Sequence, residues 1–321
     1  MRVTGPRWSL AGASTPVGTL YRGREGMWAW VLHRITGVAV FIFLLVHVAD
    51  TAVVRISPAA YNQVMGMYHR PIMALGEAVL VAAVTLHGLN GIRVALIDLA
   101  PQGARWQRAI FYAVLGVFAV AMAFFLPAHF RNAFGSHEMI EAANTAKAVV
   151  SHLAVAALAV PALRTRRSVE ASAGGSRERL GWLLMRGSGV LLIALVAGHI
   201  ITNLMTGDGV RQINFAFVAG KWANPFWQTW SLLLLLLAMA HGANGMRTVI
   251  EDYTSRPATV TPPNTLSLRA RPGIFASARF WLLALLYLLT LVVVALGVLV
   301  LFTLDPCPPG APLHLLPSFC I

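Results

Sequence analysis

Long apolar runs dominate this sequence, and short polar segments rich in arginine separate them. Six runs are long enough to cross a bilayer as helices, which takes about 20 mainly apolar residues. They cover residues 27–49, 72–97, 108–128, 180–204, 227–250 and 279–303. A seventh run, 148–163, is shorter and fits a short tilted span, an interfacial helix or a re-entrant segment. The pattern predicts an all-α integral membrane protein with about seven transmembrane helices.

Composition supports this class and argues against a self-contained soluble enzyme. Hydrophobic residues make up 57% of the 321 positions and charged residues 12%, about half the charged fraction of a soluble domain. Cys307 and Cys320 are too few to hold an iron–sulfur cluster or a cysteine-based zinc site. No dinucleotide, phosphate-loop or nucleophile-elbow motif follows a predicted strand.

The net charge of +13 mainly reflects topology, and nucleic-acid binding is not expected. If the N-terminus is cytoplasmic and all seven runs cross, the positive-inside rule is satisfied. The few cations then left outside are Arg55, Arg70, Arg131, Lys147, Arg211 and Lys221. The tail also lies outside, where its two cysteines form a disulfide or remain free thiols.

The chain contains an internal repeat. The segment 87–98, HGLNGIRVALID, returns at 241–252 as HGANGMRTVIED. The segment 34–47 opens with RITGV and ends on a histidine, and 186–199 opens with RGSGV and also ends on a histidine. The offsets of 154 and 152 residues predict two three-helix halves of the same orientation, related by a pseudo-two-fold axis along the membrane normal.

Two parallel halves with three spans each need one more crossing between them, which the run at 148–163 would supply. The predicted organisation is a first half over 1–130 and a connector with a basic cytoplasmic linker over 131–180. A second half over 181–304 and a proline-rich tail over 305–321 follow.

Four histidines, one in each of four spans, are the main candidates for function. They are His47, His87, His199 and His241. Ionisable residues inside a bilayer are usually functional, although a single histidine on an apolar helix is more often a hydrogen-bonded packing residue. The repeat places His87 opposite His241 and His47 opposite His199, as bis-histidine haem ligation requires. The two pairs differ in depth by roughly 15 Å at the helical rise per residue, which predicts two stacked haems.

Other polar and small residues near these histidines have two interpretations each. Arg34 and Arg186, at the cytoplasmic helix ends, either pair with haem propionates or extend to the interface. Glu77 is either a proton-path residue or an interfacial carboxylate without a role. Four glycines leave room for a flat macrocycle or allow close helix packing; they are Gly88, Gly91, Gly242 and Gly245.

At these residues the chain resembles the cytochrome b membrane anchors of succinate dehydrogenase (succinate:quinone oxidoreductase). Segment 28–38, WAWVLHRITGV, is similar to the S-x-x-H-R-x-[ST]-G opening of the C anchor, and 87–98 is similar to its second-helix motif H-x-x-x-G-I-R-x-x-x-x-D. Segments 185–190 and 241–253 resemble the D anchor, whose second helix ends in Asp-Tyr. The resemblance spans nearly the whole chain outside the connector and the tail, and implies C and D anchors fused in one chain.

The resemblance implies a quinone site near the cytoplasmic face, lined by Tyr253, Asp252, Arg34, His33 and Trp30. Tyr253 would donate a hydrogen bond to a quinone carbonyl, and Asp252 and His33 would relay protons. Trp30 departs from the family pattern, because many C anchors have serine there. The second histidine pair is expected only in the two-haem branch, which often uses menaquinone.

The implied function is that of a haem b anchor in a bacterial cell membrane, with a flavoprotein and an iron–sulfur subunit bound on the cytoplasmic face. Succinate oxidation would take place on the flavoprotein, and quinone reduction beside this chain. The alternatives are a fumarate reductase anchor, another di-haem quinone-linked cytochrome b, and a secondary transporter. A transporter usually has broken helices at the midplane, whereas these apolar runs are mostly unbroken.

Overall fold

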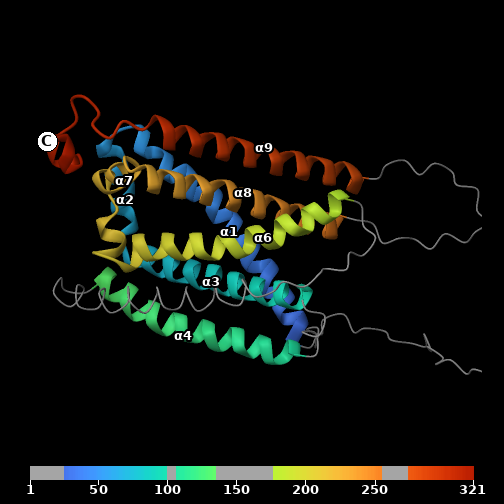
Figure 1. Cartoon of the computed structure of the whole chain (residues 1–321). Coiled ribbons are helices and arrows are strands. Elements are labelled where there is room, and N and C mark those ends of the chain that lie inside the picture. Colours follow the sequence, from blue (N-terminus) through green and yellow to red (C-terminus); the bar gives the residue numbers. More distant parts are fainter. Residues whose placement is uncertain (1–24, 100–105, 135–175, 255–273) are drawn as a thin grey trace, which may run out of the picture.

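The computed structural model describes residues 25–99, 106–134, 176–254 and 274–321, and within these ranges every regular element is helical (Figure 1). Within the described ranges, six helices are long and apolar enough to cross a membrane. They are α1 (Glu25–Ala52), α3 (Pro71–Leu99), α4 (Gln107–Phe134), α6 (Ser176–Ile200), α8 (Pro225–Thr254) and α9 (Ile274–Thr303). The prediction of an all-α integral membrane protein is confirmed. The seventh predicted span and the basic linker lie outside the described residues.

The two halves of the chain run in the same direction. Helices α1 and α6 begin at the end of the bundle that contains Arg34 and Arg186, which we call the arginine end (Figure 1). The C-terminal segment 304–321 lies at the opposite end, the tail end. Helix α4 finishes at the tail end, whereas α6 starts at the arginine end, as two parallel three-helix repeats require. The predicted boundaries of the four segments stay predictions.

Helices α1, α3, α6 and α8 form the centre of the bundle, α4 packs on α3, and α9 packs on α8 and α1 (Figure 1). Phe41, Leu235 and Met239 are buried where α1, α8 and α9 meet. Gly242 on α8 makes this packing possible, because a Cβ atom there would overlap the Phe41 ring. Large apolar side chains such as Trp281 and Leu291 cover the outer face of α9, as expected where lipid is the solvent.

Short elements that the apolar pattern did not predict cover the tail end. Helices α2 (Pro58–Tyr68) and α7 (Phe215–Trp222) lie there (Figure 1), and a π-helical segment, Ile201–Met205, extends α6. Each short helix has an N-cap of the usual kind: Ser57 Oγ accepts from the Ala60 amide, and Asn214 Oδ1 accepts from the Phe217 amide.

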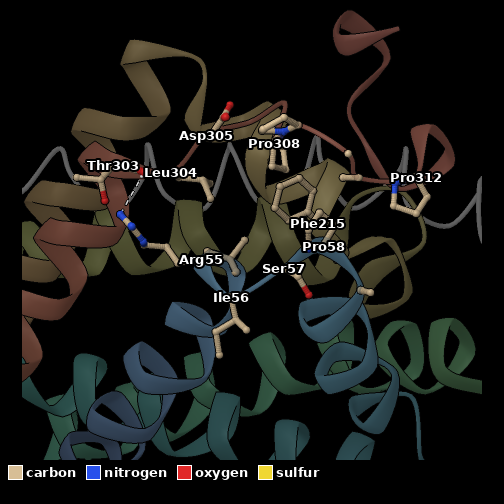
Figure 2. Close-up of a pocket in the computed structure, with 15 residues that line it drawn as sticks. Arg55, Ile56, Ser57, Pro58, Phe215, Thr303, Leu304, Asp305, Pro308 and Pro312 are labelled. Atoms are coloured by element: carbon tan, nitrogen blue, oxygen red, sulfur yellow. Dashed lines mark hydrogen bonds between the residues drawn. The ribbon is translucent and has the colours of Figure 1, made fainter.

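The C-terminal tail folds over these short elements and is closed by a disulfide between Cys307 and Cys320. The disulfide alternative is therefore correct and the free-thiol alternative is wrong. A pocket of about 420 Å³ lies between the tail and the segment 54–59. Figure 2 shows the Arg55 side chain at its edge, where Nη1 donates to the Thr303 carbonyl at 3.1 Å. None of the candidate site residues lines this pocket.

The packing predicts unequal effects at two glycines that are equivalent in the repeat. Gly242→Ala should destabilise the protein by about 1–3 kcal/mol, because the added methyl group overlaps Phe41. Gly88→Ala should change stability by only about 0.5 kcal/mol, because the nearest atom, Ile193 Cγ1, is 3.7 Å from the new Cβ. Thermal unfolding of both variants in one detergent measures the difference, and equal midpoints would contradict this account of the α1–α8 contact.

Candidate functional site

The four span histidines meet as two facing pairs. His87 on α3 and His241 on α8 have ring centroids 6.3 Å apart, with planes at 89°. His47 on α1 and His199 on α6 have centroids 5.9 Å apart, with planes at 84°. Each of the four central helices thus contributes one imidazole. These are the pairs that the repeat predicts, while their role as metal ligands stays a prediction.

The rings of the pair nearer the arginine end are held through Nδ1 in equivalent ways. His87 Nδ1 lies 3.1 Å from the His33 carbonyl and 3.3 Å from Thr36 Oγ1. His241 Nδ1 lies 3.1 Å from Ser188 Oγ. Thr36 and Ser188 occupy the same position in the two halves, 152 residues apart. In the tautomer whose Nδ1–H donates to this carbonyl, Nε2 of His87 is the free acceptor, as a metal-binding imidazole requires.

Two glycines that the sequence analysis did not single out make room for these rings. A Cβ atom at Gly37 would lie 2.9 Å from His87 Cε1, and one at Gly189 would lie 3.2 Å from His241 Cε1. Both glycines follow directly after the hydroxyl residues that contact the rings. The repeated R-x-[ST]-G-V segment was the available signal, since it contains both features in both halves.

The four glycines that were singled out contact neighbouring helices instead. Gly88 faces Ile193, and Gly242 faces Phe41. Gly91 faces the His33 ring at 3.7 Å, and the equivalent Gly245 faces the Met185 side chain at 3.6 Å. The structure therefore shows close packing at these four positions, while their making room for a macrocycle stays a prediction.

The pairs fit haem better than a bare metal ion. Among the described residues, no three His, Cys, Asp or Glu side chains gather in a way that could hold a metal ion. Haem needs only two axial ligands, because the macrocycle supplies the other four. With metal–imidazole bonds of about 2 Å and ring centres about 1 Å further out, two axial imidazoles have centroids roughly 6 Å apart. The separations of 6.3 and 5.9 Å agree with this value.

Four of the five predicted quinone residues gather at the arginine end. The Arg34 guanidinium forms an ion pair with Asp252 and lies over the Trp30 ring, 4.0 Å from its centroid. The Tyr253 ring is 5.9 Å from the same guanidinium, and 72% of the residue is exposed. Arg34 of the first half is thus joined to Asp252 of the second.

His33, the fifth predicted residue, lies apart from this group. Its ring stacks on His87 with centroids 4.0 Å apart and planes 5° from parallel. Its Nδ1 atom is buried and has no hydrogen-bond partner among the described residues. His33 therefore lies beside the inner histidine pair rather than beside Tyr253.

The repeat produces a second group at the same end, which lacks the equivalents of Tyr253 and His33. Arg186 donates to Asp98 Oδ2 from Nη2 at 2.5 Å and from Nε at 3.1 Å, and its guanidinium lies 5.1 Å from the Trp182 centroid. Position 99, equivalent to Tyr253, is leucine, and Met185 is equivalent to His33. Both Arg34 and Arg186 thus have carboxylate partners, and their predicted contacts with propionates stay predictions.

Glu77 on α3 faces the neighbouring helix α4. Its Oε2 atom is 3.6 Å from His129 Nε2 on α4, and both side chains are largely buried. His129 Nε2 also lies 2.8 Å from the Ala74 carbonyl. The contact shows that Glu77 is enclosed between α3 and α4, while its role in proton transfer stays untested.

With this geometry established, comparison with known proteins identifies the family. The family model for the succinate dehydrogenase/fumarate reductase transmembrane subunit matches residues 13–125 and 174–270, one segment in each half. The chain belongs to this family. It is accordingly a multi-pass membrane component of an oxidoreductase complex, and the resemblance seen in its motifs is confirmed.

Individual relatives agree with the family assignment. The succinate dehydrogenase 2 membrane subunit SdhC of Mycobacterium tuberculosis is 52% identical over 107 residues, which are 33% of this chain and 79% of the relative. The hydrophobic membrane anchor subunit of Halobacterium salinarum succinate dehydrogenase is 34% identical over 110 residues, 34% of this chain and 84% of the relative. The succinate dehydrogenase hydrophobic membrane anchor subunit of Archaeoglobus fulgidus is 35% identical over 82 residues, which are 25% of this chain and 68% of the relative.

The ion pairs between the halves of this anchor protein generate a stability prediction. Arg186→Asp alone should lower stability by about 1 kcal/mol, because it places two carboxylates together at a partly exposed site. The double variant Arg186→Asp/Asp98→Arg should recover most of that loss. Unfolding in a fixed detergent at low and high salt measures the coupling. If the stability loss of the double variant equals the sum of the losses of Arg186→Asp and Asp98→Arg, this ion pair does not join the halves.

Proposed function

We propose that this chain is the haem b membrane anchor of a succinate:quinone oxidoreductase, with C-type and D-type anchors fused in one polypeptide. The observation that carries the proposal is the presence of two facing histidine pairs, built by the four central helices of two repeated halves. The family match in both halves supports the fusion, and relatives named as succinate dehydrogenase membrane subunits support the complex.

The residues present fit two haems b. His87 and His241 would hold one nearer the arginine end, and His47 and His199 would hold the other nearer the tail end. Bound haem would supply one-electron transfer within the membrane. The chain's own contribution at the first pair is orientation: the His33 carbonyl and Thr36 fix the His87 ring, and Ser188 fixes His241.

The quinone site is the group around Arg34. Tyr253 would donate a hydrogen bond from its hydroxyl to a quinone carbonyl, and the nearby Arg34 charge favours negative charge on that oxygen. Asp252 holds the guanidinium in place and would deliver protons from the aqueous side. His33, stacked on His87, would act between this site and the first histidine pair. Menaquinone is the quinone we propose, as in the two-haem branch.

The arginine end would face the cytoplasm of a bacterial cell and bind the iron–sulfur and flavoprotein subunits. The proposed quinone site around Arg34 lies at this end, and the positive-inside rule favours a cytoplasmic location for the same end. The dicarboxylate site would lie on the flavoprotein. The family includes fumarate reductase subunits as well, so fumarate reduction by the same architecture is the second candidate function.

The histidine pairs predict which haem each substitution removes. In the purified complex, His87→Leu should abolish one of two redox transitions in the haem absorption band, and His47→Leu should abolish the other, because each loses an axial ligand. His69→Gln, a change at an exposed histidine outside the pairs, should keep both. A redox titration that shows both transitions unchanged in the two leucine variants would refute the ligand assignment.

The arginine-end group predicts a loss of quinone reduction. Tyr253→Phe should lower succinate:quinone activity by about tenfold or more, because a hydrogen bond to a carbonyl that gains negative charge is lost. Reduction of a dye that accepts electrons from the soluble subunits should be unchanged. Tyr112→Phe, at an exposed tyrosine on α4, is the matched control. Wild-type quinone activity in Tyr253→Phe would show that the site lies elsewhere.

A further inference from the structure

Lys221, on α7 at the tail end, is a half-buried cation with neutral neighbours. Its Nζ atom donates to Thr202 Oγ1 at 3.0 Å and to Asn203 Oδ1 at 3.1 Å. It also lies 4.4 Å from the centroid of Trp227. No carboxylate in the described part of the chain lies within ion-pair distance of it. Burial lowers the pKa of Lys221 to about 8.

The polar partners of Lys221 connect it to the outer histidine pair, His47 and His199. Thr202 and Asn203 belong to the π-helical segment that begins two residues after His199. Asn203 Nδ2 donates to the His199 carbonyl at 2.8 Å. Thr202 Oγ1 donates to the Gly198 carbonyl at 2.9 Å and lies 3.3 Å from the His199 carbonyl. Lys221 is near enough for its charge to act on the His199 imidazole. Single-turn π segments often occur at functional sites.

No carboxylate of the described residues pairs with this half-buried charge, and its desolvation is costly, so the site favours an anion that these residues do not supply. The opposite side of the outer pair does not suit a bound anion. There Asp50, three residues after His47, accepts a hydrogen bond from the Tyr68 hydroxyl at 2.5 Å, and its carboxylate would repel another carboxylate. The charge distribution around the outer pair therefore directs an anionic group toward α7.

We propose that Lys221, oriented by Thr202 and Asn203, binds the propionate carboxylates of the haem held by His47 and His199. The proposal rests on the proposed haem function and extends it, since it assigns a carboxylate site at the tail end, far from Arg34 and Arg186. In this proposal, the propionates of the outer haem would lie toward the π-helical segment and α7.

The test compares Lys221→Gln with Lys221→Arg in the purified complex in nanodiscs. Lys221→Gln should lower the midpoint potential of one haem and leave the other unchanged, because a nearby cation favours the reduced form. The same haem should transfer to apomyoglobin about tenfold faster, as expected for a lost charge-assisted hydrogen bond. Lys221→Arg should behave like the unmodified protein. Arg55→Gln, which removes another tail-end cation, should change neither haem.

Four outcomes would overturn the proposal. Unchanged potentials and transfer rates for both haems in Lys221→Gln would show that Lys221 binds no propionate. An effect that disappears in nanodiscs without anionic phospholipid would show that Lys221 binds a lipid phosphate instead. A complex without haem at the outer pair would refute this proposal while leaving the inner pair, and a complex without any haem would refute the proposed function itself.

Discussion

The structure depends most on the polar partners of the inner histidine pair, His87 and His241, because an imidazole buried among apolar helices without such a partner is costly. For His87 the partners are the His33 carbonyl and Thr36 on α1, and for His241 the partner is Ser188 on α6. Each hydrogen bond fixes one helix against its neighbour. Once these helices are placed, the rings face each other at a spacing that suits one iron between them.

The repeat gives two similar halves, and sequence differences then assign them different tasks. At the arginine end, the first half has His33 and the second half has Tyr253, whereas the equivalent positions in the other half hold Met185 and Leu99. At the tail end, one side of the outer pair has Asp50 with Tyr68, and the other side has Lys221. Burial and, to a lesser extent, the hydrogen bond to Asp50 raise the pKa of Tyr68 to about 12, so this hydroxyl stays protonated. The asymmetry therefore lies in a few polar side chains on a symmetric helical frame.

Apolar run length and the internal repeat were sufficient to predict the six long helices and the pairing of the histidines. The short elements at the tail end were missed because α2 and α7 are too short for a spanning pattern, and only their caps, Ser57 and Asn214, mark them. The π-helical segment at 201–205 has no composition signal of its own.

The detail of the site was harder to predict than the ligand pairs. Motif proximity grouped His33 with Arg34, but adjacent helical residues point about 100° apart, so only one of them faces Tyr253. The roles of Gly37 and Gly189 depend on contacts with another helix. Such contacts are set by helix rotation and separation, which a single sequence does not encode in its apolar pattern.

The central claim is that each histidine pair holds one haem b. The most direct measurement is the haem content of the unmodified purified complex, determined as the pyridine haemochrome and divided by the amount of this chain. The account predicts two haems b per chain. A ratio of one would contradict the role given to the His47–His199 pair, and a well-folded complex without haem would contradict the account as a whole.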